Sequence, residues 1–271
     1  MTTFSIVTVC HNAAAALVGT AKSIFDQTFS DYQFIVQDRA STDQTADIVK
    51  TYGDWIDSFH SDPDANTAGA MNRALGCCTG QFTLFLEAGV RLVSNDVLAK
   101  LPAQLLEDDD IVSGHAIAVE TRKPHLYRDP ALFWSGPISD MQATFVRTDL
   151  AREMPFDESL KFASALDFVS RARLRGAQFR VIDLAIYRKS FGSAMASREI
   201  DGFSERHRTL MRYFGETHAV DATLRGELAE LMTEKFGVMH RRDALKQMSV
   251  PQLLAEYEKL NVLLEKPGSK S

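Results

Sequence analysis

Short apolar runs alternate with helical patterns through the first ninety residues of the chain. Four runs have the length of buried strands: Phe4–Cys10, Phe34–Val36, Ile56–Phe59 and Phe82–Leu86. Between them, three segments have the apolar spacing of helices: Ala14–Phe25, Asp43–Tyr52 and Ala68–Cys78. Strands that are separated by helices usually pair in parallel, with helices on both faces of the sheet. The sequence therefore predicts an α/β fold built on a mostly parallel, Rossmann-like sheet.

The later pattern is less regular. A helix capped by Ser94-Asn-Asp96 is expected to run to about Leu106, and further elements are expected at Asp110–Val119 (strand), Ser164–Arg175 (helix) and Phe179–Leu184 (strand). Glu120–Ser139 contains three prolines and predicts a long loop of the kind that is usually functional or mobile. After Ser197 the pattern is helical, at Gly202–Phe214, Asp221–Phe236 and Pro251–Leu264. We expect a main domain at 1–198, a helical segment at 199–265 and a disordered tail at 266–271.

Composition excludes several classes of protein. The net charge of −6 predicts no general attraction to nucleic acid. The three cysteines cannot form a disulfide framework, and adjacent Cys77 and Cys78 lack the partner spacing of a zinc site. No stretch of about 18 apolar residues indicates a membrane span. A cytoplasmic location is therefore expected.

Polar residues follow the first two predicted strands. His11 and Asn12 follow the first, and Asp38 ends the second, just before Arg39. Open α/β sheets bind ligands in the crevice at such strand ends, where Asp38 could accept hydrogen bonds from a base or ribose. In the alternative interpretation, Ser41-Thr-Asp-Gln44 is a capping box for the helix that begins near Thr45. That interpretation leaves Asp38 and Arg39 unexplained.

Several segments, taken in order, resemble family-2 glycosyltransferases of the GT-A fold, especially bacterial enzymes of surface-polysaccharide assembly. The resemblance covers about residues 3–196. It lies in Ser5-Ile-Val-Thr-Val-Cys-His-Asn12, Asp38-Arg-Ala-Ser-Thr-Asp43, Ser61-Asp-Pro-Asp64, Ala70-Met-Asn-Arg73, Phe85-Leu-Glu-Ala-Gly89, Pro137-Ile-Ser139, Gln142-Ala-Thr-Phe-Val-Arg147 and Phe156-Asp-Glu-Ser-Leu-Lys161.

The resemblance implies a nucleoside-diphosphate sugar as donor, with uridine as the expected nucleoside. The residues that it places against the donor are Thr8, Val9, Asn12, Asp38, Asp64, Arg73, Glu87, Ala88 and Gly89. A carboxylate would accept hydrogen bonds from the base and ribose, and Arg73 would meet the diphosphate. Two alternatives stay open: Asp64 as a turn residue after Pro63, and Arg73 as a solvated helix position. Asn72 is expected to bond the backbone.

The metal motif departs from the family pattern. Where the family often has Asn-Ala-Gly-Asp, this chain has Glu87-Ala-Gly-Val90, so the last carboxylate is missing. Manganese or magnesium prefers oxygen ligands, and Glu87 could still bind such an ion together with diphosphate oxygens and water. The missing carboxylate makes a metal doubtful. Arg91 could instead stabilise the leaving diphosphate, or it is an exposed residue after a turn.

The expected catalytic base is also replaced. The family's Ala-Asp-Tyr-Asp-Phe-like helix start reads Ser164-Ala-Leu-Asp-Phe168, with Ala165 at the position of the acid. Asp167 is retained, but residues two apart on a helix point in different directions, so an inward-bonded structural role is the alternative to a catalytic one. Asp140 is a candidate substitute, as are Asp157 and Glu158. The segment Asn66-Thr-Ala-Gly69 lacks a further donor-side acid.

Two functions are consistent with these features. The first is an inverting glycosyltransferase that moves a sugar from a nucleoside diphosphate to a polysaccharide or lipid-linked acceptor. The second is a catalytically degenerate relative that binds a nucleotide and acts as a partner or regulatory protein. The C-terminal helices are expected to be a packing appendage or a homo-oligomer contact. The basic cluster His240-Arg-Arg242 is either a solvated helix end or a peripheral contact with the inner face of a membrane. The absence of a G-x-G-x-x-G motif disfavours a dehydrogenase.

Overall fold

The computed structural model describes residues 2–63, 66–118, 124–125, 141–189, 199–214, 225–226, 228–229, 232–233, 244–245 and 247–265. The chain divides into two compact units, one formed by residues 1–131 and 137–192 and the other by residues 132–136 and 193–271. Asp64, Asp140, most of Glu120–Ser139 and the tail after residue 265 lie outside the described residues, so the expectations for them stay predictions.

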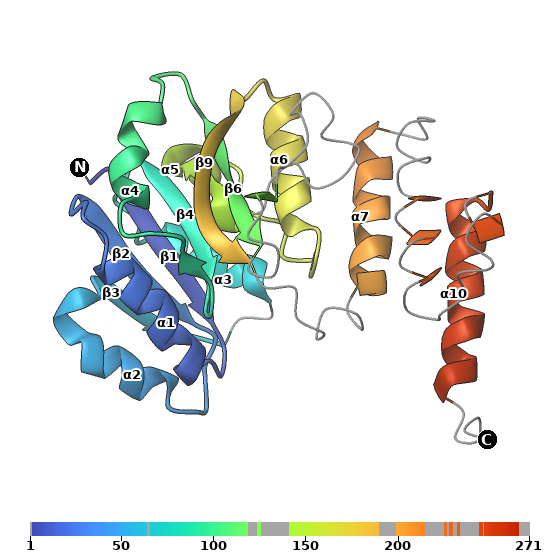
Figure 1. The fold of residues 1–271 in the computed structure, drawn as a ribbon, viewed down its shortest axis with the longest axis horizontal. Coiled ribbons are helices and arrows are strands. Elements are labelled where there is room, and N and C mark those ends of the chain that lie inside the picture. The colour runs from blue at the N-terminus through green and yellow to red at the C-terminus, as the bar shows by residue number, and fades with distance from the viewer. Residues whose placement is uncertain are drawn as a thin grey trace. The chain divides into compact units, whose positions relative to one another are not determined.

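One mixed sheet forms the centre of the first unit (Figure 1). Its nine strands, counted over the described residues, are β1 (Phe4–Cys10), β2 (Tyr32–Asp38), β3 (Ser58–Ser61), β4 (Phe82–Glu87), β5 (Arg91–Leu92), β6 (Ile111–Ala118), β7 (Pro124–His125), β8 (Thr144–Arg147) and β9 (Phe179–Lys189). They follow the order β3-β2-β1-β4-β8-β6-β9-β5, and β7 pairs with β6.

The two halves of this sheet differ in strand direction. Strands β3, β2, β1 and β4 are all parallel, as the alternating pattern predicts. Strand β8 is antiparallel to both β4 and β6, whereas β6 and β9 are parallel to each other. The α/β class is confirmed, and the parallel half is the part of the sheet that can form a ligand crevice at its carboxyl edge.

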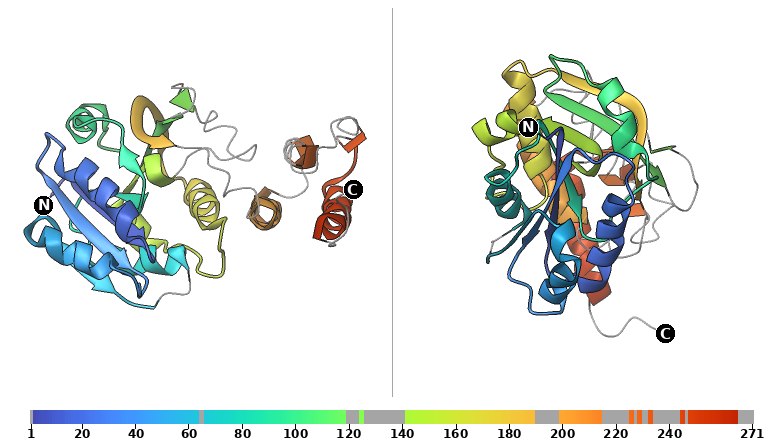
Figure 2. Two further views of the ribbon diagram at one scale, coloured as in Figure 1. Left: turned by 60° about the horizontal axis from the view of Figure 1, so that its bottom comes forward. Right: turned by 90° about the vertical axis from the view of Figure 1, so that its left-hand side faces the viewer.

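Helices flank the sheet (Figures 1 and 2). The α-helices of this unit are α1 (Ala14–Phe25), α2 (Thr45–Tyr52), α3 (Thr67–Leu75), α4 (Val97–Lys100), α5 (Thr148–Glu153) and α6 (Ser164–Leu174), and short 3-10 turns occur at η1 (Gly53–Trp55), η2 (Pro102–Gln104) and η4 (Met141–Ala143). Side chains of α1 and α2 pack with alternate residues of β1, β2 and β4, including Phe4, Phe34 and Phe82. Helix α3 contacts β1 and β2, and covers the other alternating set of their residues.

Several predicted boundaries were wrong, including those of the helix after Ser94 and of strands β3 and β9. The helix after Ser94 ends at Lys100, not near Leu106, because Pro102 lacks the N–H that would continue it and a 3-10 turn follows. Strand β3 begins at Ser58, two residues after the predicted start. Strand β9 extends to Lys189, five residues beyond the predicted end, because it continues along β6 through irregular register.

Close packing of β1 and β4 depends on a glycine. A Cβ atom at Gly80 would lie 2.4 Å from the backbone of Phe4 and Ser5, a distance that no side chain tolerates. The backbone N–H of Gly80 also donates to Ser5 Oγ over 2.9 Å. Gly80 therefore sets how β4 enters the sheet beside β1, and with it where Glu87 lies at the far end.

The second unit is helical where it is described. Helix α7 spans Glu199–Phe214 and helix α10 spans Val250–Glu265, close to the predicted segments. Residues 225–226, 228–229, 232–233 and 244–245 are also helical. The buried side chains of this unit include Leu210, Leu228, Met232, Leu245 and Leu253. Among the described residues, no helix combines the length and apolar character needed to span a bilayer.

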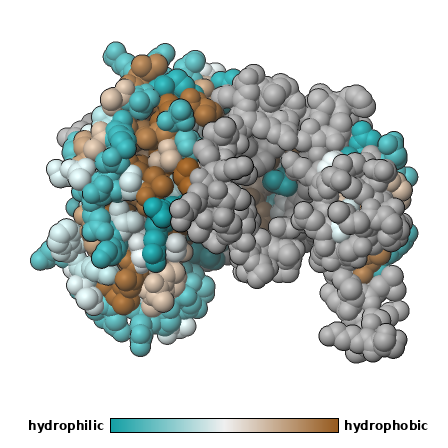
Figure 3. Space-filling model, viewed as in Figure 1, coloured by the Kyte–Doolittle hydropathy of each residue, from teal (hydrophilic) through white to brown (hydrophobic). Residues whose placement is uncertain are grey.

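Several large apolar side chains of the first unit stay exposed among its described residues: Trp55, Leu106, Phe162, Leu174 and Val181. On the face drawn in Figure 3, apolar surface lies in patches bordered by polar residues. Trp55 packs against Phe25, whose ring centroid is 5.2 Å away, and so extends an aromatic cluster outward from the core.

Candidate functional site

The carboxyl ends of four parallel strands meet at one edge of the sheet. The register pairs Cys10 with Asp38, Asp38 with Ser61, and Val9 with Glu87. The loops that leave β1, β2, β3 and β4 therefore begin side by side. This is the edge at which the sequence predicts a ligand crevice.

Asp38 is directed into the protein at this edge. Its side chain is 1% exposed. Oδ2 accepts hydrogen bonds from the backbone N–H of Ser41 (2.9 Å) and from Ser61 Oγ (2.7 Å). Oδ1 accepts from Ser41 Oγ and from Cys10 Sγ, the latter over 3.7 Å. Burial opposes ionisation of the carboxyl, but the hydrogen bonds from Ser41 and Ser61 outweigh it and hold the pKa of Asp38 below its ordinary value.

These contacts make Asp38 an anchor that joins β2 to β3 and to its own following loop. All four of its donors belong to the protein, so a base could bond the carboxylate only by displacing one of them. The expectation that Asp38 reads a base is not tested by this geometry and stays a prediction.

Asn12 connects the β1–α1 loop to the β2–α2 loop. Its backbone N–H donates to Ser41 Oγ (2.8 Å), and its Oδ1 accepts from the backbone N–H of Thr42 (2.8 Å). Asn12 and Ala40 both adopt positive φ angles, 48° and 52°. Non-glycine residues adopt this region at a cost, and such strain is usually retained where a loop must keep one shape. His11 adds a contact of 2.9 Å from Nδ1 to the carbonyl of Arg39.

The capping-box interpretation of Ser41-Thr-Asp-Gln44 was wrong. Ser41 Oγ bonds Asn12 and Asp38 rather than the first turn of α2. Gln44 is the N-cap residue of α2, and its side chain makes no capping hydrogen bond. Asp43 accepts from the backbone N–H of Thr45 instead, over 3.0 Å. The polar groups of this loop therefore join the β1–α1 loop to the β2–α2 loop instead of capping α2.

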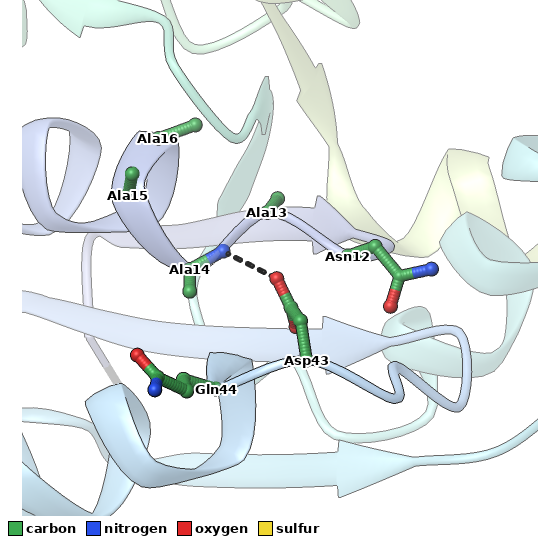
Figure 4. Close-up of a pocket in the computed structure, with 7 residues that line it drawn as sticks. All are labelled: Asn12, Ala13, Ala14, Ala15, Ala16, Asp43 and Gln44. Atoms are coloured by element: carbon green, nitrogen blue, oxygen red, sulfur yellow. Dashed lines mark hydrogen bonds between the residues drawn. The ribbon is translucent and has the colours of Figure 1, made fainter.

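Asp43 also reaches the start of helix α1 (Figure 4). Its Oδ2 accepts from the backbone N–H of Ala14 over 3.1 Å, while Thr45 Oγ1 accepts from the N–H of Ala13 at the same distance. An open depression of about 620 Å³ lies here, lined by Asn12, Ala13, Ala14, Ala15, Ala16, Asp43 and Gln44. The hydrogen bond from Thr45 lowers the pKa of Asp43, although partial desolvation opposes it.

Residues Thr8 and Val9 precede this loop on opposite faces of β1. Thr8 is fully buried, and its hydroxyl has no hydrogen-bond partner among the described residues. Val9 is 7% exposed and lies between Gln37 of β2 and Glu87 of β4 in the register. Val9 is therefore the one of these two donor-site candidates that shares a sheet face with Glu87.

The turn after β4 packs against α1. Glu87 is exposed at the strand end, and its carbonyl accepts from the N–H of Val90 over 3.0 Å. Ala88 donates to the carbonyl of Val9 over 3.4 Å. Gly89 has a φ of 104° and donates to Thr20 Oγ1 over 2.8 Å, which ties the turn to the helix. Glu87 is thus held at the crevice edge by a turn that only glycine adopts easily.

Arg91 lies along helix α1 just beyond this turn. A Cβ atom at Gly19 would come within 2.5 Å of Nε and Nη2 of Arg91, so the guanidinium rests directly on the glycine. Arg91 is exposed and begins β5. Gly19 lies three residues beyond Ala16, which lines the depression, so the Arg91 guanidinium lies along the same face of α1 as Ala16.

Helix α3 and its N-cap residue bond the segment 156–158, which lies between α5 and α6. Its N-cap residue, Asn66, accepts from the N–H of Gly69 over 3.0 Å. The Asn72 amide donates to the carbonyl of Phe156 (2.9 Å) and to Glu158 Oε1 (2.9 Å), and accepts from the N–H of Phe156 (2.8 Å). Asn72 thus bonds backbone, as expected for a structural residue. Arg73, the next residue, is exposed.

Asp167 supports the same segment from helix α6. Its side chain is 1% exposed, and its Oδ2 lies 2.7 Å from Arg171 Nε. Arg171 Nη2 in turn donates to the carbonyl of Pro155 over 2.8 Å. Phe156 packs on Phe85, with ring centroids 5.6 Å apart. Through Arg171, Asp167 therefore helps to position the segment 155–158. A catalytic role for Asp167 stays a prediction.

A metal at this edge would depend on Glu87. The described residues contain no group of three or more His, Cys, Asp or Glu side chains close enough to hold an ion. The Glu87 carboxylate is a hard oxygen donor, so it fits magnesium or manganese when the ion takes its other ligands from a diphosphate and water.

One residue of this edge was missed by the sequence reasoning. Gln37 is fully buried on β2, directly beside Val9 and His60 in the register. From the sequence, Asp38 was placed at the end of this strand, but no role was given to Gln37, which lies between Asp38 and the apolar run that ends at Val36. A glutamine between an apolar run and the crevice aspartate was the available signal.

Comparison with known proteins places the chain in a family. The profile of glycosyl transferase family 2 matches residues 5–161, more than half of the chain. The chain belongs to glycosyl transferase family 2. The match contains the four parallel strands, their carboxyl-end loops and the segment around Phe156 that Asn72 holds.

Curated family-2 relatives match over part of their length. The PGL/p-HBAD biosynthesis glycosyltransferase of Mycobacterium bovis (strain BCG / Pasteur 1173P2) is 35% identical over 123 residues, which are 44% of this chain and 48% of the relative. The amylovoran biosynthesis glycosyltransferase AmsB of Erwinia amylovora is 30% identical over 90 residues, 31% of this chain and 30% of the relative. The match thus spans about half the length of the first relative.

Solved structures share the GT-A fold of this family-2 chain. Staphylococcus aureus TarS 1–349 in complex with UDP-GlcNAc has a TM-score of 0.62 and 20% identity, covering 86% of this chain and 73% of that one. Mannosyltransferase PcManGT from Pyrobaculum calidifontis, in complex with GDP-Man and Mn²⁺, has a TM-score of 0.67 and 16% identity, covering 98% and 81%. These likenesses confirm the fold predicted from the sequence.

Proposed function

We propose that the protein is a glycosyltransferase that moves a sugar from a nucleoside-diphosphate sugar, with uridine as the nucleoside, onto a polysaccharide or lipid-linked acceptor. The family-2 match over residues 5–161 carries this proposal, because it contains the whole carboxyl edge of the parallel strands. The names of the relatives, which refer to PGL/p-HBAD and amylovoran biosynthesis, support an acceptor of the cell-surface glycan class.

The crevice would bind the donor across the strand ends. The diphosphate would lie near Glu87 and the base on the β2 side of Val9, with Asn12 keeping the two flanking loops in one shape. Exposed Arg73 on α3 and exposed Arg91 beside α1 would meet phosphate oxygens, since guanidinium groups bind phosphates with paired hydrogen bonds. A magnesium or manganese ion held by Glu87 would neutralise charge on the leaving diphosphate.

Glycosyl transfer with inversion needs a group that removes a proton from the acceptor hydroxyl. Ala165 stands at the family position of that acid, and Asp167 is engaged by Arg171. Glu158 is a described, exposed carboxylate in the segment that Asn72 and Asn66 hold. We propose Glu158 and Asp140 as the carboxylates to test for this role. A lipid-linked acceptor would bring the protein to the inner face of the membrane.

A donor assay tests the proposed function. The full chain would be incubated with UDP-glucose, UDP-GlcNAc, UDP-galactose and GDP-mannose and with lipid-extracted acceptors, with release of nucleoside diphosphate as the readout. We expect acceptor-dependent release from one UDP-sugar, and a lower rate when a chelator removes divalent ions. Binding of UDP without release against every acceptor would instead favour the catalytically degenerate alternative. Absence of both binding and release would contradict the proposal.

A further inference from the structure

The side chain of Gln37 is an unexplained polar group at the crevice edge. It is 0% exposed, and neither Oε1 nor Nε2 has a hydrogen-bond partner among the described residues. Its neighbours along β2, Phe34, Ile35 and Val36, are buried and apolar. Buried amides are nearly always bonded, because an unsatisfied donor or acceptor costs free energy that an apolar side chain would not. A group that completes the bonds of Gln37 is therefore expected in the functional state.

The register shows on which side of the sheet such a group would bind. Gln37 is opposite Val9, and Val9 is opposite Glu87 on its other side, so these three side chains share one face in a row across β2, β1 and β4. Gln37 and Glu87 are two strand spacings apart, roughly 10 Å. If the diphosphate lies at Glu87 and the ribose over Val9, the base lies at Gln37.

The neighbouring aspartate is already engaged. Asp38, the residue expected to bond the base, accepts four hydrogen bonds from Ser41, Ser61 and Cys10. Breaking these contacts would release the loop that they hold. Gln37 has no such contacts to lose among the described residues. Gln37 also lies one residue from the end of β2, and a bond to a ligand would cost it none of the contacts that the structure describes.

We infer that Gln37, rather than Asp38, reads the base of the donor nucleotide. This inference rests on the proposed function. A primary amide carries an acceptor and a donor side by side. It therefore pairs with a base edge that presents a ring N–H next to a carbonyl oxygen: Oε1 accepts from the N–H and Nε2 donates to the carbonyl. Uracil presents this edge at N3 and O4, and guanine presents it at N1 and O6.

Gln33 provides a matched control on the same strand. It lies four residues earlier and on the same face as Gln37, at the amino end, away from the crevice. Its Oε1 accepts from Ser5 Oγ (3.0 Å) and from the N–H of Thr79 (2.9 Å), and its Nε2 donates to the carbonyl of Cys77 (3.1 Å). Gln33 is thus a structural amide whose oxygen and nitrogen both have hydrogen-bond partners.

The test measures binding of UDP and of N3-methyl-UDP, which lacks the ring N–H, by calorimetry with the full chain. Wild type should bind N3-methyl-UDP roughly ten- to a hundred-fold more weakly than UDP. Gln37→Leu should lose a similar factor for UDP and bind the two ligands equally, which is the signature of a coupled pair. Gln33→Leu should keep the wild-type preference for UDP.

Thermal unfolding separates a binding role from a structural one. Without ligand, Gln37→Leu should melt no lower than wild type, because it removes an unsatisfied buried amide, whereas Gln33→Leu should melt lower. A Gln37→Leu variant that still prefers UDP to N3-methyl-UDP would overturn the inference and leave the proposed function intact. Preference for GDP over UDP, abolished by Gln37→Leu, would support the role of Gln37 with guanine as the base. No binding of UDP or GDP to wild type would overturn both.

Discussion

Asp38 at the end of β2 accepts a hydrogen bond from Ser61 Oγ at the end of β3 over 2.7 Å, so the two strands are joined where the crevice begins. The same carboxylate accepts a hydrogen bond from the backbone N–H of Ser41. A residue that the sequence predicts to contact the ligand thus joins the two strands beside the proposed donor crevice. Substitutions at this edge can separate residues that stabilise it from residues that would bind or turn over a donor.

Replacing Asp38 should destabilise the fold. Asp38→Asn puts an amide N–H against the donors of Ser41 or Ser61 and removes the charge, so we expect a loss of about 1.5–3 kcal/mol in the free energy of unfolding. Urea denaturation followed by circular dichroism measures it. Asp54→Asn changes an exposed carboxylate and should leave stability unchanged. Equal stability of the two variants would contradict the anchoring role.

The stability contributed by Asp38 should depend on pH. Its pKa is lowered in the folded chain, so its contribution is present above the ordinary aspartate pKa of about 3.9 and is lost as pH falls through the folded value. Between pH 6 and pH 8 this group should cause no change. The free energies of unfolding of wild type and Asp38→Asn should therefore approach each other only as the pH falls below about 4. A difference in unfolding free energy that stays constant down to low pH would show that the ionised Asp38 carboxylate is not its cause.

Glu87→Gln should impair turnover with little effect on stability. The side chain is exposed, so its substitution leaves the core intact, but it removes the described carboxylate that fits a metal beside the diphosphate. We expect at least about a hundred-fold lower kcat and a loss of sensitivity to chelator. Glu153→Gln, which changes an exposed residue at the end of α5, is the control. Wild-type turnover in Glu87→Gln would remove Glu87 from the mechanism.

Gly19 and Arg91 can be tested as a pair. Gly19→Ala should stabilise α1 by about 0.5–1 kcal/mol, because alanine is the better helix former, while its methyl group displaces the Arg91 guanidinium. If Arg91 binds the diphosphate from its position against Gly19 of α1, Arg91→Ala should lower kcat at least about tenfold. Gly19→Ala should lower it in the same direction. Arg188→Ala, on the neighbouring strand, is the matched control. Full activity of Arg91→Ala would show that Arg91 is an exposed residue after a turn and takes no part in turnover.

The three cysteines should differ in reactivity. Cys10 and Cys78 are buried, and desolvation raises the pKa of both, that of Cys10 to about 12 with a further contribution from Asp38. Cys77 is only partly buried, and its Sγ lies 3.3 Å from His60 Nε2. Brief treatment of the native chain with iodoacetamide should modify Cys77 first. Peptide mass spectrometry identifies the modified residue, and early labelling of Cys10 would show that the β1 edge opens.

The sequence predicted the frame of this edge better than its contacts. Alternation of apolar runs and helical spacing located β1, β2, β4 and α1, because burial of both sheet faces leaves a strong local signal. The role of Asp38 could not be read in the same way, because Ser61 lies 23 residues away along the chain and becomes its neighbour only through the pairing of β2 with β3.

Two further features depended on long-range geometry. Asn72 bonds Phe156 and Glu158, more than eighty residues later, so its structural partners could not be identified from spacing. Gln37 could be recognised as unsatisfied only once the neighbouring strands were in place. Pro102, by contrast, was a local signal for the end of α4 that the helical pattern beyond it obscured.

A crystal structure of the chain with UDP and Mn²⁺ tests the central claim most directly, because it locates the nucleotide relative to the four parallel strands. We expect density for the diphosphate beside Glu87 and for uracil against Gln37, with Asp38 still bonded to Ser41 and Ser61. Nucleotide bound away from the carboxyl ends of β1, β2 and β4, or no nucleotide at saturating UDP, would contradict it.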